Sequence, residues 1–135
     1  MTNSAKILLS ALLLAPAAAP PLALIVSLTA PAAAHHSYSM FDMNKTAVLE
    51  ATVTRFKWQN PHAFIQAEVP VNGQSESWSI EMTSPNNLIQ EGWKRTSLRT
   101  GDKVRIWVHP LRSGAKGGSY VGVRLADGST LGEVG

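Results

Sequence analysis

Apolar and polar residues alternate with a period of two in several stretches beyond residue 46, a pattern that predicts β-strands with one buried face. The stretch 47–58 directs three apolar side chains to one face, namely Leu49, Ala51 and Val53. The stretch 62–69 directs four inward, namely Ala63, Ile65, Ala67 and Val69. We therefore expect two strands here, separated by a turn at residues 59–61.

A third strand should return antiparallel to the second, because Asn72 and Gly73 tolerate the positive φ angles of a tight hairpin. It covers 76–82 and directs inward Trp78, Ile80 and Met82. A fourth strand over 103–110 directs inward Val104, Ile106 and Val108. A glycine-rich hairpin loop at 112–118 leads to a fifth strand over 119–125, with inward residues Val121, Val123 and Leu125.

The segment between the third and fourth strands has the signals of one short helix. Ser84 can cap its amino end, Pro85 suits its first position and Gly92 can end it. We expect Leu88 and Ile89 to face the barrel.

Three strands, a helix and two more strands form the order of an OB-type barrel. The prediction is an all-β fold with one short helix, an OB-like five-stranded antiparallel barrel over residues 46–135. An open antiparallel sandwich or meander fits the same periodicity, because alternation locates strands better than it determines closure.

Residues 1–34 follow a different pattern, with Lys6 ahead of a long apolar run that ends in small residues at Ala32 and Ala34. This pattern is typical of a secretory signal peptide cleaved after Ala34. A membrane anchor is disfavoured because prolines at 16, 20 and 21 would leave backbone carbonyls unpaired in lipid. We therefore predict a periplasmic protein without a stable membrane anchor. Its first residues, 35–45, should form a flexible arm that Tyr38, Met40 and Phe41 could fasten to the barrel.

Composition narrows the classes of partner. The 135-residue chain has a formal charge of +3, which falls to +2 when Lys6 leaves with the signal peptide. A nearly neutral exported protein is a poor candidate for binding nucleic acid. The chain has no cysteine, so disulfides and thiolate metal sites are excluded.

The histidines are the candidate metal ligands, namely His35, His36, His62 and His109. Cleavage after Ala34 gives His35 a free amine beside its imidazole, and this pair can chelate one metal ion. Nitrogen donors favour Cu(II) over Zn(II) and Ni(II), so copper is the expected ion. Met40 and Met43 could add thioether ligands for Cu(I). The alternative is that His35 and His36 are solvated residues of a disordered arm.

A second candidate site uses aromatic side chains on the outer face. Phe64 and Trp107 alternate away from the core beside His62 and His109, and OB barrels bind extended ligands on one face. An envelope protein or a glycan could dock there, with help from the 112–118 loop. The alternative is that Trp107 covers hydrophobic surface under the amino-terminal arm or the helix.

Acidic residues and serines are dispersed, so no arrangement of catalytic residues stands out and we expect no enzyme. The leading hypothesis is an exported binding module with copper at the mature amino terminus. Its rival is a structural or adaptor barrel that binds an envelope protein or glycan.

Several motifs occur in a fixed order: AHHS at 34–37, W-x-N-P-H at 58–62, S-P-N-x-L at 84–88, G-W at 92–93 and L-x-x-G-D at 98–102. In this order they resemble a family of small secreted bacterial proteins known only as a domain of unknown function. The resemblance spans essentially all of the chain after residue 34. It implies an exported small β-barrel, and it implies no activity and no functional residue. Tyr38 departs mildly from the phenylalanine that the family often has.

Overall fold

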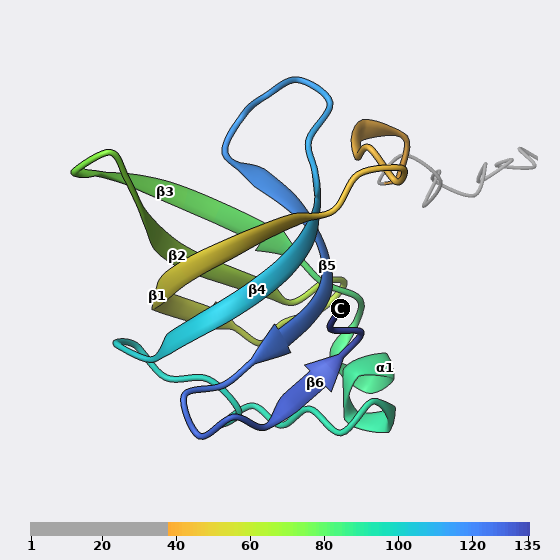
Figure 1. The fold of residues 1–135 in the computed structure, drawn as a ribbon. Helices are drawn as coiled ribbons and strands as arrows, with labels where there is room; N and C mark the ends of the chain where they lie inside the picture. Colours follow the sequence, from red (N-terminus) through yellow and green to blue (C-terminus); the bar gives the residue numbers. More distant parts are fainter. Residues whose placement is uncertain (1–37) are drawn as a thin grey trace, which may run out of the picture. The chain divides into compact units, whose positions relative to one another are not determined.

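The computed structural model of the protein describes residues 38–135. These residues form a six-stranded sheet, one α-helix and a short 3₁₀ helix (Figure 1). In chain order the elements are η2 (Tyr38–Met40), β1 (Ala47–Lys57), β2 (Phe64–Val71), β3 (Gln74–Glu81), α1 (Pro85–Gln90), β4 (Lys103–Pro110), β5 (Gly117–Arg124) and β6 (Thr130–Gly132). The predicted order of three strands, a helix and two strands is confirmed, and β6 is an additional strand that pairs with β5.

The sheet closes into a five-stranded barrel. Its strand order is β3-β2-β1-β4-β5-β6, and a further pairing joins β3 to β5. Neighbouring strands are antiparallel except at this closing pair, which is parallel and joins Ser79–Glu81 to Gly117–Ser119. The predicted OB-like closed barrel is therefore correct, and the open alternative is excluded. We call the β3–β5 pairing the seam.

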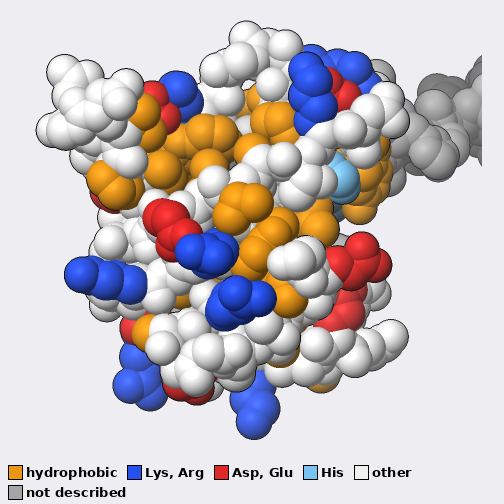
Figure 2. Space-filling view, in the orientation of Figure 1, with side chains coloured by type: hydrophobic (Ala, Val, Ile, Leu, Met, Phe, Trp, Pro, Cys, Tyr) orange, Lys and Arg blue, Asp and Glu red, His pale blue; other side chains and the backbone are white. Residues whose placement is uncertain are grey.

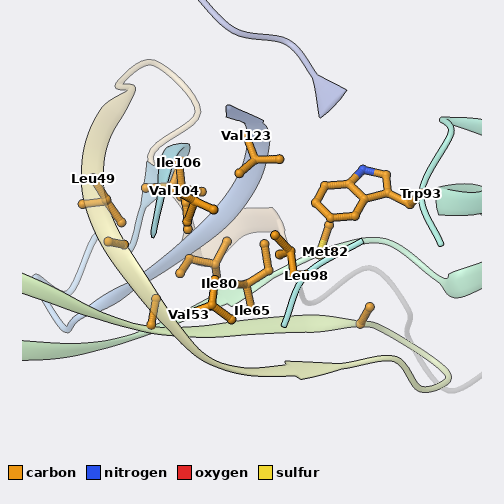
Figure 3. Close-up of a cluster of buried hydrophobic side chains, with 14 of the residues drawn as sticks. Leu49, Val53, Ile65, Ile80, Met82, Trp93, Leu98, Val104, Ile106 and Val123 are labelled. Carbon is orange, nitrogen blue, oxygen red and sulfur yellow. The ribbon is translucent and has the colours of Figure 1, made fainter. Parts of the chain in front are cut away.

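The core lies inside the barrel and is built from the predicted alternation (Figure 3). Fully buried side chains come from every strand of the barrel, and examples are Val53, Ile65, Ile80, Ile106 and Val123. Trp93 follows α1 and lies at one side of this cluster, where it is 1% exposed.

One of the inward residues predicted for β5, Val121, is wrong. The register between β4 and β5 shifts between Trp107 and Val108, so Val121 is an extra residue on β5. Tyr120 packs against the core in its place, and Val121 is only half-buried. A β-bulge of this kind reverses the alternation beyond it, and periodicity alone cannot locate a bulge.

The helix begins as predicted, because Ser84 Oγ accepts a hydrogen bond from the Asn87 amide and Pro85 opens the first turn. Leu88 is fully buried, as expected. The expectation for Ile89 is wrong, since it is 59% exposed. Neighbouring residues on a helix point about 100° apart, and a helix of six residues has room for only one buried stripe.

The end of the predicted 112–118 loop belongs to β5 and makes closure possible. Gly117 and Gly118 pair with Ser79 and Ile80 across the seam. A β-carbon at Gly118 would lie 2.8 Å from the carbonyl oxygen of His109, which is closer than real β-carbons approach. β5 can therefore approach β4 this closely only with glycine at position 118, and at the seam itself a β-carbon at Gly117 would lie 3.1 Å from the carbonyl oxygen of Ser79.

The amino-terminal segment, residues 38–45, is fastened to the end of β4. Phe41 is 3% exposed and forms a β-bridge with Leu111, while Tyr38 and Met40 remain exposed. The Asp42 amide donates to the carbonyl oxygen of Pro110 at 2.8 Å. Of the three side chains that could fasten this segment, that of Phe41 is buried, and the carbonyl of Met40 also accepts a hydrogen bond from the Arg112 amide at 2.9 Å.

The predicted signal peptide at 1–34 and the two histidines at 35 and 36 lie outside the described residues. Within residues 38–135 no helix combines the length and the apolar character that crossing a membrane requires.

Candidate functional site

A cleft of about 450 Å³ is formed by the amino-terminal segment, the seam and the segment after β6. Its lining residues that carry polar groups or sulfur include Met43, His62, Glu81, Glu91, His109, Ser119 and Glu133. We call it the histidine cleft. The structure thus brings His62 and His109 together on one cleft.

The seam explains why these residues meet. Ser119 pairs with Glu81 of β3 on one side and with His109 of β4 on the other. Residues directly opposite each other in paired strands point to the same face. Strands lie about 4.7–4.9 Å apart, so the α-carbons of Glu81 and His109 are about 10 Å apart. The row Glu81, Ser119 and His109 forms the floor of the histidine cleft.

His62 is placed by the hairpin of β2 and β3. The Ala63 amide donates to the carbonyl of Thr83 at 3.1 Å, and the Met82 amide donates to the carbonyl of Ala63 at 2.9 Å. These bonds extend the ladder past the strand ends and set His62 beside Glu81. The imidazole Nδ1 then donates a hydrogen bond to Glu81 Oε1, with the His62 side chain 35% exposed.

His109 is oriented by the amino-terminal segment. Its Nδ1 donates to the carbonyl oxygen of Lys45 at 2.7 Å. Lys45 is held in turn by Asp42, because the Lys45 amide donates to the Asp42 carbonyl at 3.0 Å and the two side chains form an ion pair at 3.3 Å. The fastening of residues 38–45 therefore also determines the orientation of one candidate ligand.

The two imidazoles share one chemical feature. A backbone carbonyl and an ionised carboxylate can only accept hydrogen bonds, so Nδ1 of each ring carries the proton. In a neutral ring the other nitrogen, Nε2, then has a free lone pair. Metal-binding histidines commonly have this arrangement: the ring nitrogen that does not bind the metal donates its hydrogen to a carboxylate or a backbone carbonyl.

The charge of the histidine cleft favours cations. Three carboxylates line it, from Glu81, Glu91 and Glu133, and its lining within residues 38–135 includes no Lys or Arg. Glu133 follows β6, which pairs antiparallel with β5, and its backbone passes so close to Gly122 that a β-carbon there would lie 2.1 Å from the Glu133 carbonyl oxygen.

The described residues do not hold a complete metal site. Among residues 38–135 no three His, Cys, Asp or Glu side chains converge closely enough to hold one ion. The predicted ligands His35 and His36 lie outside the described part of the chain. Because His62 already contacts Glu81, His109 is not placed to share an ion with this pair, so the structure supplies two separately oriented imidazoles, each of which needs further donors to hold a metal ion.

The predicted aromatic site has a different outcome. Trp107 is on the outer face of β4, as the alternation indicated, but it is only 7% exposed. The guanidinium carbon of Arg124 lies 5.4 Å from the centre of its ring, and a β-carbon at Gly135 would lie 3.9 Å from its indole nitrogen. Trp107 is therefore covered and not an exposed surface for a ligand, and the groups found beside its ring are Arg124 and Gly135. Phe64 is half-buried.

A second cleft, of about 480 Å³, is lined by residues of β1, β4 and the end of β5, with Pro70 of β2. Its charged lining residues are Glu50, Lys103, Arg105 and Arg124, and its apolar ones include Pro70 and Leu125. We call it the basic cleft. Glu50 forms an ion pair with Arg105. Figure 2 shows Lys and Arg side chains distributed over one face of the molecule, together with Asp and Glu side chains, hydrophobic side chains and one histidine.

Sequence reasoning missed Glu81, although a signal for it existed. The two-residue turn at Asn72 and Gly73 pairs Val71 with Gln74, and this register continues to Phe64 opposite Glu81. Extending the hairpin register from the turn would therefore have placed a carboxylate beside His62.

The closed barrel and its histidine cleft define a small OB-like β-barrel with a candidate cation site. The chain belongs to a protein family described as "Family of unknown function (DUF6152)", whose model matches residues 22–120. The resemblance to a domain of unknown function is thereby confirmed. No curated protein and no solved structure matches the chain.

Proposed function

We propose that this protein is an exported, non-enzymatic module that binds copper in the histidine cleft. One observation carries the proposal: two imidazoles line the same cleft, and each has its Nδ1 committed to a hydrogen-bond acceptor. Both rings are thereby left with Nε2 as the metal-binding nitrogen.

The missing donors are the two histidines that precede the described residues. Tyr38 lines the histidine cleft, and His36 is two positions before it. Export is supported by the signal-peptide pattern of residues 1–34, and cleavage after Ala34 would make the amine of His35 a further nitrogen donor.

Copper is the ion that this donor set favours. Among divalent first-row ions, nitrogen sites bind Cu(II) most strongly, and the chain has no cysteine to favour zinc or an iron–sulfur cluster. The carboxylates of Glu81, Glu91 and Glu133 add electrostatic attraction for any cation entering the cleft.

The test is a competition titration with Cu(II) on protein that begins at His35. Loss of a residue that only supports a metal ligand typically weakens metal binding by roughly 10–100-fold. His62→Ala and His109→Ala remove the ligands themselves, so each should weaken Cu(II) binding by at least that factor. Lys103→Ala in the basic cleft is the matched control and should bind as the unaltered protein does. If both histidine variants keep full affinity, the proposal is wrong.

A second variant tests the contribution of the amine. One residue added before His35 moves the free amine away from the His35 imidazole. Cu(II) binding should then weaken about tenfold or more, as it does when a group that supports a metal ligand is removed. Mass spectrometry of the exported protein identifies its first residue. Unchanged affinity in the extended protein, or a first residue other than His35, would remove the amine from the site.

A further inference from the structure

The basic cleft has an excess of positive charge. Its charged lining residues are Lys103, Arg105 and Arg124 against the carboxylate of Glu50. Glu50 forms its ion pair with Arg105. Within residues 38–135 neither Lys103 nor Arg124 forms an ion pair with a carboxylate. Two cationic groups of this cleft are therefore available to an anionic ligand.

Strand pairing gathers the three cations on one face of the sheet. Glu50 of β1 lies opposite Arg105 of β4, and Arg105 lies opposite Arg124 of β5. Like charges directly opposite each other destabilise a pair of strands. Lys103 is two positions before Arg105, so its side chain points to the same face about 7 Å along the strand. One carboxylate cannot balance three cations placed so closely, and a bound anion would relieve the remaining repulsion.

Arg124 is held in an orientation suited to binding an anion. Its guanidinium carbon lies 5.4 Å from the centre of the Trp107 ring, and the residue is half-buried. A guanidinium placed against an aromatic ring has little freedom left to lose when it binds a ligand. Its planar N–H donors match the two oxygens of a carboxylate. The covered Trp107 thus positions Arg124 without contacting a ligand itself.

The remaining lining indicates an organic anion. Apolar atoms come from Ala51, Pro70, Val104 and Leu125. Such atoms suit the hydrocarbon skeleton of an organic molecule, which inorganic ions such as phosphate do not have. The cleft volume of about 480 Å³ lies within the roughly 300–1,000 Å³ that is usual for small-molecule sites.

We infer that the basic cleft binds a small organic anion with at least two carboxylates, one bound by Arg124 and another by Lys103. The hydrocarbon part of the ligand contacts Pro70 and Leu125, and Arg105 stays paired with Glu50. This inference goes beyond the proposed function and does not depend on it, because within residues 38–135 the two clefts have no lining residue in common.

The experiment titrates metal-free protein with citrate at low salt, followed by calorimetry and by NMR shifts of the backbone amides. Arg124→Gln should weaken citrate binding about tenfold or more, because it removes a charge-assisted, two-pronged hydrogen bond. Lys103→Ala removes a point charge and should weaken binding about threefold or more. Arg55→Gln is the matched control, since Arg55 is an exposed arginine outside the cleft lining. It should change citrate affinity by less than about twofold.

Two further variants separate a ligand-binding role from a structural one. Glu50→Gln removes the carboxylate of the cleft and frees Arg105, so citrate should bind about threefold more tightly or better. Arg124→Lys keeps the charge but not the planar donors, so its affinity should fall between those of the unaltered protein and Arg124→Gln. Thermal unfolding verifies that each variant folds.

Three results would overturn the inference. The first is citrate binding no tighter than acetate, which has a single carboxylate. The second is inorganic phosphate binding as tightly as citrate, which would make the cleft a general anion site. The third is an equal loss of affinity in Arg124→Gln and Arg55→Gln. Failure of the copper titrations would leave this inference standing, and its own failure would leave the proposed function standing.

Discussion

The two clefts of this barrel are nearly equal in volume, about 450 and 480 Å³, but they differ in charge and in donor atoms. The histidine cleft carries two imidazoles, a thioether and three carboxylates. The basic cleft carries Lys103, Arg105 and Arg124, with Glu50 already paired to Arg105. The size of a hollow therefore says little about its ligand here, and the donor groups decide which cleft can receive a cation. The nearly neutral total charge of the chain conceals this difference.

The two clefts also differ in how their walls are held. One wall of the histidine cleft is the amino-terminal segment, which depends on Phe41. Phe41→Ala should lower the free energy of unfolding by about 3–5 kcal/mol, as truncation of a buried aromatic residue does. Chemical denaturation measures this, and Met40→Ala, at an exposed position, should stay within about 0.5 kcal/mol of the unaltered protein. Equal stability of the two variants would mean that Phe41 does not fasten the segment.

Glutamates at the two clefts offer a matched pair. Glu81→Gln removes the charged acceptor that orients His62 and should weaken Cu(II) binding by roughly 10–100-fold. Glu50→Gln changes the same chemical group at the basic cleft and should leave the affinity unchanged. Isothermal titration compares them, and similar affinities for both variants would contradict the role given to Glu81.

The carboxylates that do not contact a histidine should have a smaller effect. A charge about 8 Å away in water contributes about 1 kcal/mol to the energy of a divalent ion. Glu91→Gln or Glu133→Gln should therefore weaken Cu(II) binding about two- to fivefold at low salt, and the effect should fade at an ionic strength near 1 M. Stopped-flow and equilibrium measurements across salt concentrations check this. An effect that persists in high salt would indicate direct coordination by the carboxylate.

The smallest expected effect is a dependence of the amino-terminal segment on pH. Partial desolvation, the largest single influence, tends to raise the pKa of Asp42, but hydrogen bonds from Lys45 and the Asn44 amide outweigh it and hold that pKa below 3.8. Because the folded pKa is depressed, the stabilisation is complete above the unfolded pKa and is lost as pH falls through the folded one. Unfolding of the unaltered protein and of Asp42→Asn, compared between pH 5 and pH 2, should therefore differ most at pH 5. A difference that grows toward acid would contradict this sign.

The strands could be predicted because the apolar residues that alternate with polar ones in the sequence are the residues buried in the structure. Ile65, Ala67 and Val69 are buried as expected, and Asn72 and Gly73 have positive φ angles in the hairpin. Errors occur where long-range structure overrides local pattern. The bulge reverses the direction of Val121, and the chain's last residues and Arg124 cover Trp107.

The candidate site was predictable as a set of residues but not as an arrangement. His62 and His109 stand out in the sequence by their chemistry, yet they are 47 positions apart and on different strands. Their shared cleft depends on the seam, and alternation cannot show whether a sheet closes. Met43 could be identified as a thioether, but only the structure shows that it lines the histidine cleft and that Met40 does not.

The most direct test of the central claim is a crystal structure of the protein grown with Cu(II), with anomalous differences collected at the copper edge. The account predicts a strong peak in the histidine cleft, at bonding distance from Nε2 of His62 or of His109. A peak bound only by residues outside the cleft, a peak in the basic cleft, or a histidine cleft without copper would contradict it.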